Sequence, residues 1–438
     1  MSRLRSAVFD TVAGAAAYGL LLILMDILLA LRYGLGGQAA VFQAAYQVPA
    51  TLLAILSGGA IIGPLVPLIS RLKRHTDGAI ARQELRRIAG FVAGSHTLVV
   101  LVFAASAGTL GTLVGNGFPR ELQGDLVAAI RWGLLLLLAH GLASIGVSAL
   151  LSCGRVGAAS LVPALTPLAG IATFPWWGED GASLIVYGYL AGTAIQIVAT
   201  AGLLRRTGLA FLPPSIPRGQ VVRKFAMTFA ATGLAHAALS AVLLVNTAVA
   251  GGLSERELAG FSYGTKLVML ALAFLTSLVN NVGLPHLSDL AHQAQRNQYW
   301  RMLFRILRLA VGGSTAIALI WVAGAEEMLR IVYARGNFTL ADASAVASIQ
   351  RAFVLQAPFY ALGLICWRAL NIEGKSGPMV IASAMALAVD VPLAIWASGN
   401  WASAGIAGAH TIATAVWGLL LLAAVLREYR SGNIRGAT

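Results

Sequence analysis

The stretch "YGTKLVMLALAFLTSLVNNVGLPHLS" (263–288) decides the expected fold, because it is long and apolar enough to cross a bilayer as a helix. It contains one lysine, Lys266, near the start of its apolar run. A charge at membrane depth costs about 2.5–3.5 kcal/mol on insertion scales, so such a residue usually faces a cavity or a charged partner. Lys266 is therefore the first candidate for a functional side chain.

A second stretch, "YQVPATLLAILSGGAIIGPLVPLIS" (46–70), repeats this pattern from an initial tyrosine to a final Leu, Pro and Ser. Two shorter segments, "CGRVGAASLV" (153–162) and "EGKSGPMVIA" (373–382), also resemble each other and place Gly154 and Gly374 at a spacing of 220. In the two longer stretches, Pro67 and Pro285 lie 218 residues apart, so both spacings are close to half of the chain. They predict two halves that repeat one arrangement of helices in the same orientation, about an axis along the membrane normal.

The composition places the rest of the chain in a membrane as well. Of the 438 residues, 58% are hydrophobic and only 11% are charged, whereas soluble proteins carry roughly 25% charged residues. The net charge of +14 falls mainly between apolar runs, where basic residues set the topology and meet anionic lipid head groups. The sequence shows no basic helix with interleaved aromatic residues, the pattern that would predict nucleic-acid binding. Two cysteines exclude a disulfide framework and a zinc site.

The apolar runs predict an all-α polytopic protein with about twelve transmembrane helices. The expected spans are 11–33, 40–70, 88–113, 125–153, 156–176, 183–204, 223–250, 256–286, 302–324, 342–370, 376–398 and 401–426. They divide into an N-terminal lobe of six helices (1–204), a cytoplasmic linker (205–222) and a C-terminal lobe of six helices (223–438), related by a pseudo-twofold axis. The apolar stretch at 11–33 is interpreted as a retained first helix and not as a cleaved signal peptide. With this assignment, 23 lysines and arginines of the loops lie on one side of the membrane and four on the other. The basic side is expected to be cytoplasmic, with both termini on it.

Four charges deep inside the predicted spans are the candidate functional residues. Asp26 and Lys266 lie in opposite halves, about 10–15 Å from the outer ends of their helices. A lysine suits a phosphate group, and Asp26 would be its counter-charge; a purely structural salt bridge is an equal alternative. Arg351 and Asp390 also lie at matching depths, on helices joined by a short turn, so we expect them to form a structural ion pair.

Helix breaks point to the same region. Pro49, Gly58 and Gly59 interrupt the predicted helix 40–70, and such breaks are tolerated in a membrane where they line a cavity or pack against protein. Tyr46 and Tyr263, which begin the two repeated stretches, are further candidate contacts for a substrate. The histidines lie in different spans without metal-ligand spacing, so we expect no metal, no cofactor and no catalytic residue.

These segments, with "IVYARGNFTLADA" (331–343), resemble the MurJ (MviN) lipid II flippases of the multidrug/oligosaccharidyl-lipid/polysaccharide exporter superfamily. The likeness runs from the first helix to about residue 380, and Gly336-x-Phe338-Thr339 is its most specific part. It implies two six-helix lobes around a central cavity and alternating access that moves a polyprenyl-diphosphate-linked saccharide to the outer face of the bacterial inner membrane. The implied partners are that lipid-linked saccharide, membrane lipids and envelope-glycan synthases.

The chain departs from the family where the cavity charges are expected. Family arginines are missing from "AYGLLLILMD" (17–26) and "ATLLA" (50–54), and the family's acidic residue is Gly58 here. An Asp-Arg pair is replaced by Thr265-Lys266, and twelve helices replace the usual fourteen. Asp26 and Lys266 are therefore the family-matched cavity charges that the chain retains.

Three other functions stay open at this point. A cation-coupled multidrug exporter of the same superfamily would be favoured by cavity anions, whereas a lysine in the cavity favours an anionic head group. A polytopic glycosyltransferase or polymer ligase generally needs a sizeable outer loop with charged catalytic groups, and none is expected. A non-transporting membrane scaffold would keep only the fold.

Overall fold

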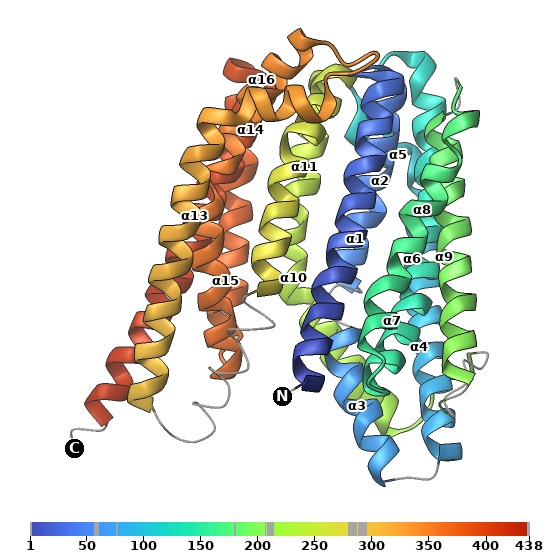
Figure 1. Cartoon of the computed structure of the whole chain (residues 1–438), viewed down its shortest axis with the longest axis vertical. Helices are drawn as coiled ribbons and strands as arrows, with labels where there is room; N and C mark the ends of the chain where they lie inside the picture. The colour runs from blue at the N-terminus through green and yellow to red at the C-terminus, as the bar shows by residue number, and fades with distance from the viewer. Residues whose placement is uncertain are drawn as a thin grey trace. The chain divides into compact units, whose positions relative to one another are not determined.

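The structure is a computed structural model that describes residues 2–56, 61–75, 78–178, 181–205, 207, 214–278, 287 and 296–435. Within these ranges every regular element is a helix, which confirms the predicted all-α class. The chain divides into two compact units (Figure 1): unit 1 is Met1–Ser240 with Ser254–Arg256, and unit 2 is Ala241–Leu253 with Glu257–Thr438.

Unit 1 begins with α1 and ends within α10. Its elements are α1 (Ser2–Tyr33), α2 (Gly37–Leu56), α3 (Ile62–His75), α4 (Gly78–Ala105), α5 (Ala107–Gly115), α6 (Arg120–Ser152), α7 (Val156–Leu161), α8 (Leu165–Ala172), α9 (Gly181–Arg205) and the first part of α10 (Gln220–Leu253), with short 3-10 turns at Val162–Ala164 and Phe174–Trp176. In this unit α6 contacts α2, α4 and α9, so it is the central helix.

Unit 2 contains the end of α10 and the remaining helices. These are α11 (Glu255–Leu278), α13 (Arg296–Tyr333), α14 (Leu340–Val354), α15 (Ala357–Ile372) and α16 (Gly377–Arg435). Here α13 contacts α14 and α15, and both of these helices also contact α16. α11 lies on α14, where Gly260 and Gly264 face Val346 and Ile349.

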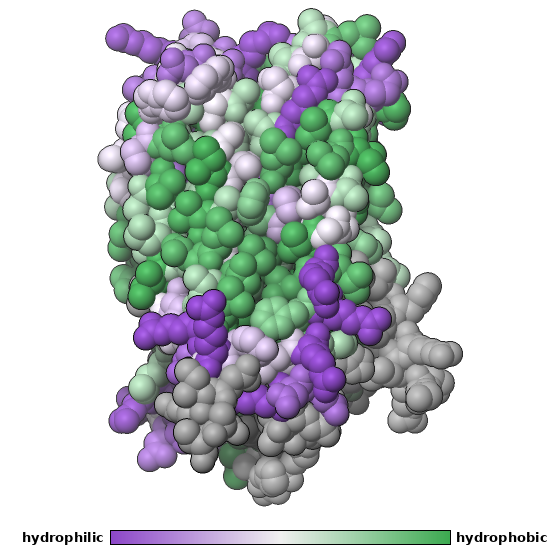
Figure 2. Space-filling model, turned by 90° about the vertical axis from the view of Figure 1, so that its left-hand side faces the viewer, coloured by the Kyte–Doolittle hydropathy of each residue, from purple (hydrophilic) through white to green (hydrophobic). Residues whose placement is uncertain are grey.

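The number of membrane spans agrees with the sequence prediction. Ten helical segments of the described chain are long and apolar enough to cross a membrane, and Ala237–Leu253 is a shorter apolar helix. One of the ten, α16, has non-helical backbone at Trp401 and Ala402, so it contains two spans. Counting both parts of α16 and the shorter helix gives twelve. Figure 2 faces the side on which α13 and α16 lie in Figure 1, and shows a broad hydrophobic belt between two hydrophilic ends.

The division between the units falls within α10 and not in the predicted linker 205–222. The first part of α10 packs in unit 1, since Phe225 and Phe229 are buried against the ring of Phe91 on α4. Aromatic residues on this part of α10 therefore attach it to the first half of the chain. The assignment of 1–204 and 223–438 to separate lobes stays a prediction.

The repeat predicted from Gly154 and Gly374 is present in the backbone. Both glycines have positive φ, 72° and 69°, at the C-terminal ends of α6 and α15. After the first glycine, Arg155 N–H donates to Leu150 O (3.0 Å); after the second, Lys375 N–H donates to Leu370 O (2.9 Å). The two helices therefore end with the same hydrogen bond at positions 220 residues apart. Glycine favours the positive φ at these turns because it has no Cβ.

A second pair of contacts follows the same offset to within a residue. At the start of α2 the Gln38 side chain accepts a bond from the Ala182 N–H (3.1 Å), and at the start of α11 the Glu257 carboxylate accepts one from the Ser403 N–H (3.1 Å). One helix-ending turn and one side-chain contact therefore recur in both units, which supports the internal repeat.

The segment that best matched the MurJ family forms the start of α14. Gly336 has a φ of 58°, and Phe338 is buried. Thr339 caps the helix: its Oγ1 accepts from the Asp342 N–H (3.2 Å), and the Asp342 carboxylate accepts from the Thr339 N–H (2.9 Å). This reciprocal capping box explains why glycine, a large apolar residue and threonine occur together here.

Candidate translocation site

In unit 1 the buried charge is Asp26 on α1, which is only 2% exposed. Gln43 on α2 donates from Nε2 to Asp26 Oδ1 (3.3 Å), so the carboxylate has a neutral donor from the neighbouring helix. A buried carboxylate needs such donors because burial without them is costly. Sequence reasoning identified Asp26 and missed Gln43, which lies on α2 just before the repeated stretch 46–70.

Tyr46 lies on α2 close to Gln43, the hydrogen-bond partner of Asp26. Its ring stacks on Phe42 (centroids 5.8 Å apart) and meets Tyr189 of α9 edge-on (5.6 Å). The residue is half-buried, so part of its surface is free for another contact. Three rings on two helices thus form an aromatic wall next to a buried carboxylate.

Pro49 does not end α2, which continues to Leu56. The proline is buried and faces Gly133 of α6, where a Cβ would come within 3.4 Å of the proline ring. Packing between α2 and α6 therefore accounts for Pro49. Gly58 and Gly59, the other predicted helix breaks, lie outside the described residues.

In unit 2 the candidate cation is Lys266 on α11, and it is half-buried. The repeated stretches begin with Tyr46 and Tyr263, whereas the offset of 220 between the equivalent turn glycines, Gly154 and Gly374, aligns Tyr46 with Lys266. Each unit thus has a half-buried side chain with a polar end at the same place in its repeated helix. The predicted relation between Lys266 and Asp26 joins the two units and stays a prediction.

Tyr263, three residues before Lys266, packs inside unit 2. It is completely buried, with ring centroids 5.2 Å from Tyr333 and 5.6 Å from Phe338. In this conformation it has no surface to offer a substrate. Its position in the repeated stretch reflects packing against the segment that starts α14.

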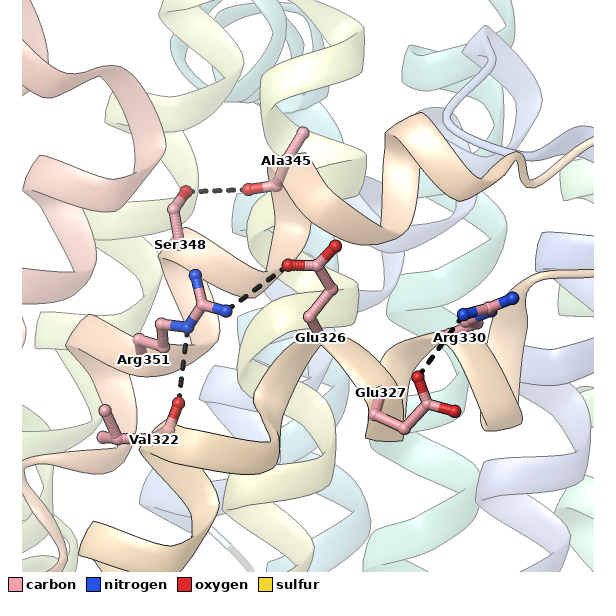
Figure 3. A network of polar contacts seen from close by, with 7 residues as sticks. All are labelled: Val322, Glu326, Glu327, Arg330, Ala345, Ser348 and Arg351. Carbon is pink, nitrogen blue, oxygen red and sulfur yellow. Dashed lines mark hydrogen bonds and ion pairs between the residues drawn. The ribbon is translucent and has the colours of Figure 1, made fainter.

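The predicted ion pair between Arg351 and Asp390 is wrong. Arg351 donates instead to Glu326 (Nη2 to Oε2, 3.4 Å) and to the Val322 carbonyl oxygen (Nε to O, 3.3 Å), both on α13 (Figure 3). The physical reason is that the predicted helix 342–370 breaks after Val354, so Arg351 lies in the last turn of the short helix α14, which packs on α13. Both side chains of the new pair are half-exposed, unlike the predicted buried pair.

Asp390 on α16 belongs to a different polar centre. Asn246 of α10 donates from Nδ2 to Asp390 Oδ1 (3.3 Å), and its Nδ2 also lies 3.1 Å from His410 Nδ1. Asp390 and Asn246 are fully buried, and the His410 ring stacks on Phe353 (4.8 Å). Sequence reasoning missed this centre, although the offset of 220 pairs Asn246 with Asp26 and gives a signal for it.

No group of three or more His, Cys, Asp or Glu side chains in the described part of the chain is placed to hold a metal ion. The polar positions in the membrane are instead single charges with amide or aromatic neighbours. Such positions can orient and neutralise a polar group that enters the helix bundle.

The family model described as "Lipid II flippase MurJ" matches residues 30–435, across both units. The chain belongs to this family. Probable lipid II flippases MurJ of Rhizobium meliloti and Haemophilus influenzae are each 24% identical to it; the matches cover 95% and 76% of this chain and 80% and 68% of the relatives.

Solved structures show the fold. The structure titled "Lipid II flippase MurJ, inward closed conformation" gives a TM-score of 0.79 at 18% identity, over 94% of this chain and 87% of the other. An inward-facing multidrug resistance MATE family transporter of the MOP superfamily gives 0.74 at 13% identity, over 96% and 98%. The fold is therefore shared with both the MurJ and the MATE structures, and the family assignment rests on the sequence match. The protein is a multi-pass membrane transporter and not an enzyme.

Proposed function

We propose that the protein moves a polyprenyl-diphosphate-linked saccharide, a lipid II-like peptidoglycan precursor or a related envelope glycan, to the outer face of the cytoplasmic membrane. The observation that carries this proposal is the family match over residues 30–435, which runs from the end of α1 to the end of α16 and so extends over both units. The internal repeat supports alternating access, because two similar units can expose a site to each side in turn.

Lys266 is the proposed contact for the diphosphate. It is half-buried in an apolar helix, and its ammonium is a compact charge that can approach phosphate oxygens from many directions. Tyr46 at the corresponding position of unit 1, with the aromatic wall around it, would face the saccharide. Asp26 would neutralise Lys266 when no substrate is bound.

The location follows from the same proposal. The basic loops would face the cytoplasm, with both termini on that side, and the substrate would be released outward. Envelope-glycan synthases that use the released lipid are the proposed protein partners.

A cation-coupled multidrug exporter is the second function that the fold permits. The MATE structures share the fold at 13% identity, whereas the family match favours the lipid substrate. Conditional depletion of the protein in its source bacterium separates the two. We expect one polyprenyl-linked saccharide to accumulate on the inner leaflet; unchanged lipid pools with increased drug sensitivity would favour the exporter.

A further inference from the structure

Unit 2 contains a pocket that the proposed translocation does not use. Its volume is about 820 Å³, and α13 and the two ends of α16, with the turn that precedes α16, surround it. The lining residues are Arg296, Lys375, Pro378, Ile381, Ala382, Leu420, Ala423, Ala424, Arg427, Glu428 and Ser431. All of them lie in unit 2. The size is in the range that holds a small ligand or a lipid head group with part of its chain.

One wall of the pocket is apolar and open to the membrane. It is formed by Pro378, Ile381 and Ala382 from the beginning of α16 and by Leu420 and Ala424 near its end. Ile381 is 63% exposed and Leu420 is 38% exposed, and both lie in a segment apolar enough to span a bilayer. Side chains of this kind are stable where hydrocarbon covers them, which favours a ligand with an apolar chain.

The rim of the pocket is basic. Arg296 and Lys375 have carboxylates within 4 Å, Glu373 at 3.8 Å and Glu428 at 3.5 Å, and the basic side chains of both pairs are about half exposed. Exposed pairs of this length are weak, so they yield readily to a phosphate. Arg427 is exposed and has no ion pair among the described residues. Three cations against two carboxylates leave an excess positive charge at the mouth.

We infer that this pocket binds a phosphate-bearing lipid of the adjacent leaflet, with its phosphate between Arg296, Lys375 and Arg427 and its chain along the α16 wall. Basic pockets between membrane helices at one end of the bundle are suited to anionic head groups. A free anion would use the rim alone and would leave the apolar wall uncovered. Lys266 is not among the lining residues, so the inferred site is distinct from the proposed diphosphate contact.

The test measures lipid binding to the full chain purified in detergent, by native mass spectrometry with phosphatidylglycerol, phosphatidylcholine and inorganic phosphate as probes. The triple variant Arg296→Gln, Lys375→Gln, Arg427→Gln should bind phosphatidylglycerol at least about tenfold more weakly, because each basic residue near an anionic lipid contributes measurably. The matched control is Arg301→Gln, Arg305→Gln, Arg308→Gln, which removes the same charge from exposed arginines on the first turns of α13. It should change binding by less than about twofold, because surface charges away from a site contribute little.

The apolar wall gives an independent variant. Ala424→Trp should fill the pocket and weaken phosphatidylglycerol binding, whereas Ala316→Trp, at an exposed position on α13, should not. Arg427→Gln alone keeps the test usable if the triple variant fails to fold. Equal loss in the charge-matched control, phosphatidylcholine binding as tight as phosphatidylglycerol, or full competition by inorganic phosphate would each overturn the inference. Flipping activity is not the readout, so the result is independent of the proposed function.

Discussion

At the scale of single residues, the membrane-embedded polar groups fall into two classes. Asp26 and Asp390 are buried with an amide donor, Gln43 and Asn246, whereas Lys266 and Tyr46 are half-buried. The first class fits the interior of a helix bundle, where a carboxylate must be hydrogen-bonded. The second class has surface left for a substrate. This difference supports the proposal that Lys266 contacts the substrate.

Lys266→Ala should abolish flipping while protein levels stay near those of the wild type, and Lys266→Arg should keep part of the activity. The reason is that alanine removes the charge that meets the diphosphate, while arginine retains it in a larger, planar group. Lys224→Ala, at an exposed position at the start of α10, is the matched control and should be neutral. Full flipping activity in the double variant Lys266→Met, Asp26→Leu would show that the two charges are structural only.

Asn246→Leu should lower the free energy of unfolding by about 1–3 kcal/mol, because it removes the donor to the buried carboxylate of Asp390. Arg351→Gln is the matched control: its partner Glu326 is half-exposed, so the loss should stay below about 1 kcal/mol. Thermal unfolding of the purified protein in detergent measures both. Equal losses in the two variants would mean that Asp390 does not depend on Asn246.

At the scale of elements, the turns after α6 and α15 are equivalent. Gly154→Ala and Gly374→Ala should each destabilise the protein by about 1–2 kcal/mol, since both positions have φ near 70°, a left-handed backbone conformation that is strained for any residue with a Cβ. Gly94→Ala, at an exposed helical position of α4 with open space around it, should be neutral or stabilising. Chemical unfolding curves compare the three. A large loss at only one of the two turns would contradict their equivalence.

The sequence predicted these elements well where the pattern was local. Apolar length predicted the twelve spans, and the glycine spacing predicted the internal repeat, because both depend on short stretches of chain. The Arg351–Asp390 pair failed because it required the direction of two side chains across helices, and the break after Val354 changed the neighbour of Arg351. The contact of Asn246 with Asp390 joins residues 144 apart in sequence, and no local pattern predicts it.

At the scale of the whole molecule, one family model matches residues 30–435 across both units, and the basic residues between the apolar segments indicate how the chain is oriented in the membrane. We expect the loops at residues 71–87 and 205–224 to be cytoplasmic. A single cysteine at position 79, in a Cys153→Ala, Cys366→Ala background, should be blocked only by reagents that reach the cytoplasm. Labelling from the periplasmic side, or an odd number of spans in fusion experiments, would reverse this topology.

The proposed flipping of a lipid-linked saccharide can be measured by reconstituting the purified full chain in liposomes loaded with lipid II on one leaflet, under a membrane potential of each sign. A glycan-modifying enzyme added outside measures the fraction of head groups that become accessible. We expect accessibility to rise with the wild-type protein in at least one polarity and to stay at the protein-free level with Lys266→Ala. Wild-type liposomes that match protein-free liposomes in both polarities would contradict it.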